Sequence, residues 1–168
     1  MRVQEIAADA GVSVPLLYHY FGSREGLLEA AMLLASDQAG SYSSRAAEGA
    51  RTARDELVAK LVGELQDTDE VRTNSAAWGE LRWSAAFEDK LKPVVQRLTR
   101  EWVDEIAAVI ARVVTEEGGS VGIDPRRAAE RLVALVEGLS GRWLTGAVEL
   151  ADIQDLLREG IAIEVPAP

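Results

Sequence analysis

Apolar side chains recur every three to four residues along most of the chain, and this spacing predicts an all-helical fold. Leu57, Leu61 and Leu65 share one face of a helix expected over residues 55–66. A longer stripe follows Pro93 and contains these apolar side chains: Val94, Leu98, Trp102, Ile106, Val109 and Val113. Strands are not indicated, because the sequence has no alternating run of β-branched and aromatic residues and no Asn-Gly turn.

Three further segments carry helical patterns. Residues 75–88 have apolar side chains on two faces, which is typical of a helix in the middle of a fold. A helix is expected over residues 126–144, with Asp124 as its N-cap, and the last helix is expected over residues 150–161. The glycine-rich residues 116–123 are expected to form a connecting loop.

The sequence pattern in the first part of the chain predicts two short helices followed by a longer one. The short helices are expected over residues 3–10 and 14–21, and the longer one extends to about residue 38. Ser13 and Ser23 have the position and chemistry of N-caps for the second and third of these helices. Short helices joined by tight turns in this way indicate a helix-turn-helix with a connecting helix.

Composition narrows the class of protein. With 168 residues, 48% of them apolar, the chain can bury a sizeable core. It has neither the unbroken run of roughly 18 apolar residues that a membrane helix needs nor a secretory leader, so we expect a soluble cytoplasmic protein. Cysteine is absent, so no disulfide or thiolate zinc site can form, and His19, the one histidine, has no catalytic partner suggested near it in the sequence. We therefore expect no enzymatic activity, no metal site and no cofactor.

The charge balance limits how the chain could bind nucleic acid. The net charge is -10, which opposes indiscriminate adhesion to DNA or to anionic lipid. Residues 1–34 hold two basic and four acidic side chains, so the remainder of the chain carries most of the acidity. Any contact with DNA must therefore be local, made by a few well-placed groups.

Residues 6–31, IAADAGVSVPLLYHYFGSREGLLEAA, carry a specific motif. The segment resembles the DNA-binding signature of the tetracycline-repressor (TetR) family of transcriptional regulators. The matching residues are Ile6, Ala7, Ala10, Gly11, Val12, Ser13, Leu17, Tyr18, Phe21 and Leu28. Tyr20 stands where histidine is commonest in the family, and Arg24 stands where lysine is. Both departures keep a hydrogen-bonding group or a positive charge.

The resemblance implies an all-α protein with two parts. Residues 1–38 would form the helix-turn-helix DNA-binding domain and its connector helix, and residues 39–168 a helical ligand-binding and dimerisation domain. Family members begin with a further helix before the one at residues 3–10, and we expect this first helix to be missing here. Either the sequence starts inside a longer protein or the protein is naturally short and binds DNA poorly. The intact DNA-contact positions favour the first explanation.

The resemblance also implies DNA-binding residues on the second helix and just after it. They are Ser13, Val14, Pro15, Leu16, Tyr18, His19, Tyr20 and Arg24. Val14, Pro15 and Leu16 have no side-chain donors, so base recognition should depend on thymine methyl groups and groove shape, with His19 as the polar reader. Tyr20 could instead pack the small domain, Arg24 could pair with a neighbouring acid, and His19 could be exposed without a role.

The second part of the chain holds four tryptophans, which suit either an ordinary core or a cavity for a flat or greasy effector. The candidate ligand-pocket residues are Trp78, Leu81, Arg82, Trp83, Trp102, Ile106, Leu139 and Trp143. Arg82 and Arg142 could pair with an anionic effector, or with Glu80 and Glu137. The resemblance implies a homodimer formed by the last two helices, with these candidate interface residues: Leu132, Leu135, Val136, Leu139, Ile153, Leu156 and Leu157.

These features together predict a ligand-responsive transcriptional regulator, more specifically a repressor. It would bind a double-stranded, pseudo-palindromic DNA operator as a homodimer, and a small-molecule effector, apolar or aromatic, would release it. No membrane partner is expected. The alternative is a helical module for binding small molecules or proteins that has lost DNA binding through loss of the first helix.

Overall fold

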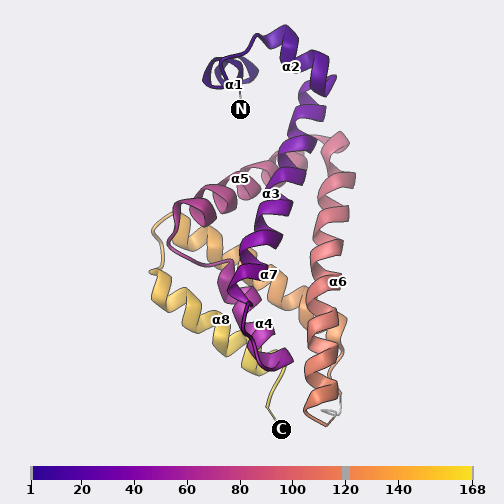
Figure 1. The fold of residues 1–168 in the computed structure, drawn as a ribbon, viewed down its shortest axis with the longest axis vertical. Coiled ribbons are helices and arrows are strands. Elements are labelled where there is room, and N and C mark those ends of the chain that lie inside the picture. The colour runs from indigo at the N-terminus through magenta and orange to yellow at the C-terminus, as the bar shows by residue number, and fades with distance from the viewer. Residues whose placement is uncertain (1, 119–121, 168) are drawn as a thin grey trace.

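The protein is described by a computed structural model that covers residues 2–118 and 122–167, and over these residues it is helical with no strands (Figure 1). The elements are α1 (Val3–Asp9), α2 (Val14–Phe21), α3 (Arg24–Ala46), α4 (Ala53–Gly63), α5 (Asp69–Phe87), the 3₁₀ helix η1 (Asp89–Leu91), α6 (Lys92–Glu116), α7 (Pro125–Leu144) and α8 (Leu150–Glu164). The all-α fold expected from the sequence is confirmed. The loop expected at residues 116–123 lies partly outside the described residues, at 119–121.

Helices α1 and α2 lie at one end of the molecule, and α3 leads from them into the body (Figure 1). Their small core contains Val3, Ala7 and Leu17, with Leu27 of α3 packed against it. Ser13 Oγ accepts a hydrogen bond from the backbone N–H of Leu16 at 3.3 Å, and therefore caps α2 as expected. Gly22, with φ of 72°, ends α2 in a conformation that favours glycine.

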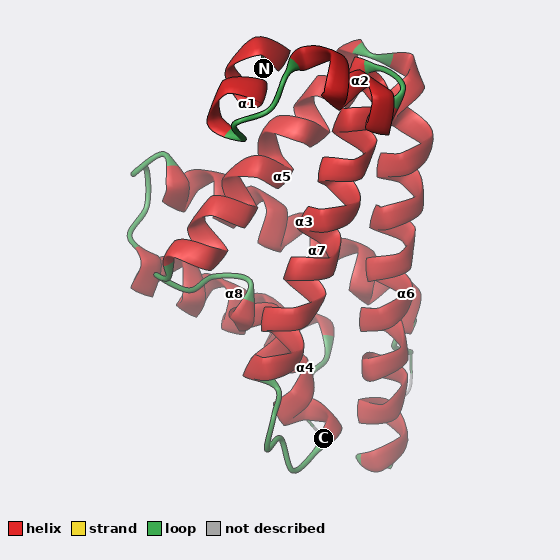
Figure 2. Cartoon of the chain, turned by 45° about the horizontal axis from the view of Figure 1, so that its top comes forward, coloured by secondary structure: helices red, strands yellow, loops and turns green. Residues whose placement is uncertain are grey.

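The body of the protein has two further apolar clusters. The larger is built mainly from α4, α6, α7 and α8, with side chains such as Leu57, Ile110 and Leu132 buried almost completely. The smaller joins α3, α5, η1 and α6 and includes Leu28 and Met32. Because Leu27 packs toward the helix-turn-helix and Leu28 toward this smaller cluster, the first turn of α3 connects the two parts of the chain. Figure 2 shows the helices of the body joined by short loops.

Two helices are longer than the sequence pattern predicts. Helix α3 continues through the serine-rich stretch to Ala46, because Tyr42 and Ser43 are buried there against α4. Ser43 Oγ donates a hydrogen bond to the Lys60 carbonyl oxygen at 3.3 Å. Helix α5 begins at Asp69 rather than residue 75, because the Thr68 hydroxyl caps it by accepting from the backbone N–H of Val71 at 3.2 Å. The expected domain division at residue 38 falls within α3.

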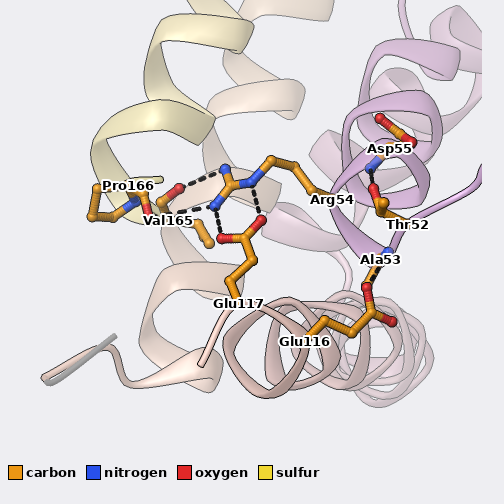
Figure 3. A network of polar contacts seen from close by, with 8 residues as sticks. All are labelled: Thr52, Ala53, Arg54, Asp55, Glu116, Glu117, Val165 and Pro166. Carbon is orange, nitrogen blue, oxygen red and sulfur yellow. Dashed lines mark hydrogen bonds and ion pairs between the residues drawn. The ribbon is translucent and has the colours of Figure 1, made fainter. Parts of the chain in front are cut away.

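A polar network holds the far end of the molecule together (Figure 3). Arg54, at the start of α4, donates two hydrogen bonds to the Glu117 carboxylate, at 2.6 and 2.7 Å, and a third to the Val165 carbonyl oxygen. Glu116 accepts a hydrogen bond from the backbone N–H of Ala53 at 2.8 Å. These contacts join α4, the end of α6 and the segment after α8. Within residues 2–118 and 122–167, no helix is both long enough and apolar enough to cross a membrane.

Candidate nucleic-acid interface and ligand cavity

Helix α2 has one buried side and one exposed side. Leu17 points into the small core, whereas Pro15, Leu16, Tyr18 and His19 are exposed. Such exposure of large apolar and aromatic side chains on a short helix has no structural benefit within the chain. It leaves a surface of suitable shape and chemistry for contact with another molecule.

The other residues near α2 that are expected to contact DNA differ in how exposed their side chains are. Tyr20 is 75% exposed, so it does not pack the small domain, and its ring meets the edge of His19 at 5.5 Å between centroids. Val14 is partly buried against the small core, and the Ser13 hydroxyl is occupied as the N-cap of α2. The part of α2 that is free to contact DNA is therefore centred on residues 15–20.

Arg24, at the start of α3, pairs with an acid from another helix. Its Nη1 lies 2.6 Å from Glu88 Oε1, just after α5, and both side chains are partly buried. The hydrogen bond to Glu88 raises the pKa of Arg24, so the guanidinium stays charged. Nearby, Lys90 Nζ lies 4.0 Å from Glu25 Oε2. In this arrangement Arg24 joins the helix-turn-helix to the end of α5, and contact with phosphate would require it to leave Glu88.

A cavity of about 430 Å³ lies in the body, between α3, α5, α6 and α7. This volume is within the range of about 300–1,000 Å³ that is usual for small-molecule sites. Four of the candidate pocket residues line it: Trp78, Arg82, Trp83 and Trp102. Three of the four tryptophans therefore line the cavity.

The other four candidate pocket residues do not line the cavity. Leu81 is buried in the smaller cluster with Leu28, while Ile106, Leu139 and Trp143 are buried in the larger one. Trp78, three residues before Leu81 on the same helical face, both packs against the smaller cluster and lines the cavity, whereas Leu81 is taken up by the cluster alone. Trp143 has the Arg72 guanidinium over its ring, 4.6 Å from the centroid.

The charges in the cavity wall are mostly negative. They are Glu64, Glu80, Glu101, Glu105 and Glu137, against Arg82. Arg82 forms an ion pair with Glu137, as the sequence allowed. Glu105 accepts a hydrogen bond from Lys60 Nζ at 2.6 Å. No sequence pattern marks this acidic wall, since its members are spread over three helices and the end of α4.

A chain of buried hydrogen bonds lies at the inner end of this wall. Asn74 Nδ2 donates to Tyr42 Oη at 3.2 Å, and Tyr42 Oη donates to Glu64 Oε2 at 2.8 Å. Burial raises the pKa of Glu64 to about 7, although the hydrogen bond from Tyr42 opposes this shift. Burial also raises the pKa of Tyr42, so its hydroxyl keeps its proton. Tyr42 lies in a serine-rich stretch that showed no sequence signal for a site.

The expected dimer-interface residues occupy two environments. Leu132, Val136, Leu139, Ile153 and Leu157 are buried inside the single chain, because the apolar stripes of α7 and α8 pack against the rest of the body. Leu135 is partly buried, and Leu156 is 45% exposed. Ile163, which is not among the expected interface residues, is 77% exposed on the same helix as Leu156.

Comparison with known proteins identifies similarities along nearly the whole chain. A family described as "Bacterial regulatory proteins, tetR family" matches residues 1–31, and one described as "BetI-type transcriptional repressor, C-terminal" matches residues 53–166. The HTH-type transcriptional regulator BetI 2 of Chromohalobacter salexigens is 30% identical over 152 residues, which are 87% of this chain and 67% of that protein.

Two solved structures have the same fold. A Rhodococcus sp. protein described as a TetR-family transcriptional regulator is 44% identical, with a TM-score of 0.89 over 98% of this chain and 87% of that one. A transcriptional regulator from Saccharomonospora viridis, solved in complex with choline, is 23% identical, with a TM-score of 0.77 over 95% of this chain and 84% of that one. At that identity, the second likeness concerns the fold alone.

Proposed function

The chain belongs to the tetR family of bacterial regulatory proteins, and we propose that within this family it acts as a ligand-responsive repressor. It binds a pseudo-palindromic operator as a homodimer and leaves it when a small molecule enters the cavity. Residues 1–38 form its DNA-binding part, and residues 39–168 its ligand-binding and dimerisation part. The observation that carries this proposal is one continuous helix, α3, which begins at the helix-turn-helix and lines the cavity further along.

The exposed side of α2 supports DNA binding. A recognition helix enters the major groove with its N-terminal residues, while side chains at its margins contact phosphates. Pro15 and Leu16 would face base edges, and Tyr18, His19 and Tyr20 would supply hydrogen bonds to bases or phosphates. Ser13 holds the first turn of this helix in place as its cap, and Val14 anchors the turn on the small core.

Two connections support coupling between the cavity and α2. Helix α3 carries Ala35 and Tyr42 on the cavity wall, and α5 carries Trp78 and Arg82. The Arg24–Glu88 ion pair ties the first residue of α3 to the end of α5. A ligand that separates α3 from α5 therefore changes the position of the helix-turn-helix, and DNA affinity falls by the coupling free energy, typically about 1–3 kcal/mol.

The proposed dimer forms through α7 and α8. Leu156 and Ile163 supply exposed apolar surface on α8, and Leu135 of α7 is partly exposed. The five buried candidates beneath them shape this surface from inside. A symmetric pair would present two α2 helices to successive major grooves about 34–36 Å apart, or somewhat further.

The proposal is tested by selecting DNA with the full chain. Duplexes that an immobilised sample retains from a random library should contain two half-sites related by two-fold symmetry. Tyr18→Ala and His19→Ala should each weaken binding to the selected duplex in a shift assay, while sedimentation still gives a dimer. Gln38→Ala, an exposed change further along α3, is the control and should bind normally. Recovery of no common sequence would favour a binding module without DNA function.

A further inference from the structure

Asn74 has an unsatisfied acceptor in the cavity wall. The side chain is 5% exposed, and its Nδ2 donates to the Ala35 carbonyl oxygen at 3.1 Å and to Tyr42 Oη at 3.2 Å. Its Oδ1 has no hydrogen-bond partner among the described residues. Turning the amide over would place Oδ1 against the Ala35 carbonyl oxygen, another acceptor, so the orientation is fixed. The site therefore lacks a donor at Oδ1.

Glu64 lies in the same hydrogen-bonded chain as Asn74, and its carboxyl group can carry a negative charge. Asn74 Nδ2 and Glu64 Oε2 both contact the same Tyr42 hydroxyl oxygen, at 3.2 and 2.8 Å, so the two side chains belong to one part of the wall. Both residues line the cavity, as do Trp78 and Trp102. A cation is attracted to a carboxylate and to the faces of aromatic rings. The wall thus combines an acceptor, an acid and indole surface.

We propose that the effector is a protonated organic amine with an apolar or aromatic body. Its N–H group donates to Asn74 Oδ1, its positive charge lies against the Glu64 carboxylate, and its body packs on Trp78 and Trp102. The inference rests on the proposed function, since it takes the cavity as the effector site. An N–H group is essential to it, because a quaternary ammonium ion carries the charge but has no donor for Asn74.

The protonation of Glu64 fits this assignment. Its pKa is about 7 in the free site, where Tyr42 of α3 donates to it and Lys60 of α4 and Glu105 of α6 act on it through their charges. A bound cation lowers the pKa of Glu64, so amine binding near pH 6 must release a proton. Affinity for the amine should consequently increase from pH 6 to pH 8, while affinity for an uncharged analogue should not.

The test compares three probes that share one body: 4-phenylbutylamine, its trimethylammonium analogue and 4-phenylbutan-1-ol. Calorimetry at pH 8 on the full chain measures each dissociation constant. The amine should bind about tenfold or more tightly than either analogue, which is the effect expected of one charged hydrogen bond. Equal binding, preference for the alcohol or the trimethylammonium ion, or no binding of any probe would overturn the proposal.

Matched variants assign the effect to residues. Glu64→Gln should weaken amine binding, and Asn74→Leu should abolish the preference for the amine over its trimethylammonium analogue. Glu48→Gln, an exposed acid outside the cavity, should change neither. Unchanged selectivity in a folded Asn74→Leu sample, judged by circular dichroism, would overturn the role of Asn74. The comparison of probes uses the unaltered chain, so it remains decisive even if a variant does not fold.

A shift assay on the selected operator separates this inference from the proposed function. If the amine binds with the expected preference but the DNA stays bound, the ligand class stands and the repressor mechanism fails. If the alcohol is preferred and releases the DNA, the mechanism stands and the ligand class fails.

Discussion

At the scale of single residues, Glu64 shows how burial changes the chemistry of an ordinary side chain. Its carboxyl group lies at the end of α4, 9% exposed, with the Tyr42 hydroxyl as its hydrogen-bond donor. The folded protein therefore holds a proton that the unfolded chain releases nearer the usual value of 4.5. This difference links the stability of the fold to pH.

Stability should fall with rising pH because of Glu64. At pH 4 the group is protonated in both states; between about 4.5 and 7 the unfolded chain loses the proton while the folded chain keeps it, which favours unfolding. Above pH 7 Glu64 is ionised in both the folded and the unfolded chain, and the free energy of unfolding stays lower by an amount of order 3 kcal/mol. Urea denaturation of the wild type and Glu64→Gln at pH 5, 6, 7 and 8 measures this. The variant should lose less stability over this range, and parallel curves would contradict the shift.

Glu88 and a DNA phosphate would compete for the Arg24 guanidinium. We expect it to exchange the carboxylate for a phosphate when the operator binds, because the ion pair is partly solvated and a charge-assisted bond replaces it. Arg24→Ala should then lower the slope of log K against log salt by about one. Glu88→Gln should tighten binding by removing the competitor. If the slope of log K against log salt is the same for the wild type and Arg24→Ala, Arg24 does not contact DNA and only pairs with Glu88.

At the scale of elements, local signals predicted the start of most helices but not all of their extents. Ser13, Ser23 and Asp124 were recognisable as caps, since each precedes an apolar periodic run. Thr68 was not recognised, because the first turns of α5 are polar and their apolar contact, through Val71, comes from the larger core. The serine-rich end of α3 is helical because of contacts with α4, which no pattern within its own residues reveals.

The Thr68 cap should contribute measurably to the stability of α5. Thr68→Ala removes the acceptor for the Val71 N–H and should lower the free energy of unfolding by about 1 kcal/mol. Thr73→Ala, an exposed position inside the same helix, should be neutral or slightly stabilising, since alanine is the better helix former there. Thermal denaturation of both variants tests the difference. Equal melting temperatures would show that the cap does not hold α5.

The cavity illustrates a second limit of sequence reasoning at this scale. The helical pattern marked residues 75–88 as apolar on two faces, and Trp78 and Trp83 from this segment line the cavity. The same spacing could not tell which face of α6 or α7 meets an empty space and which meets another helix, so Ile106 and Leu139 were selected although both lie in the core. Asn74 and Tyr42 carried no signal at all, because their importance comes from contacts between α3, α5 and the end of α4.

At the scale of the whole molecule, the proposed function requires two copies of the chain in a fixed relation. A single helix-turn-helix with a net negative charge gains little from general attraction to DNA, so affinity must come from two correctly spaced α2 helices. In the proposed dimer, the exposed apolar side chains of α8, Leu156 and Ile163, form this pairing. Dimerisation and operator binding should therefore be lost together.

Leu156→Glu tests this dependence, because it places a charge on the exposed surface of α8 while the buried Leu157 and Ile153 keep the helix attached. The variant should sediment as a monomer at concentrations where the wild type is a dimer, with unchanged circular dichroism. Its affinity for the selected operator should fall by at least about a hundredfold, because each half-site is then bound by a separate monomer. Phe87→Ser, at an even more exposed apolar position on α5, is the control and should remain dimeric and bind DNA. If Leu156→Glu stays dimeric while Phe87→Ser dissociates, the interface lies on α5, and the spacing between the two recognition helices must be derived from that face instead.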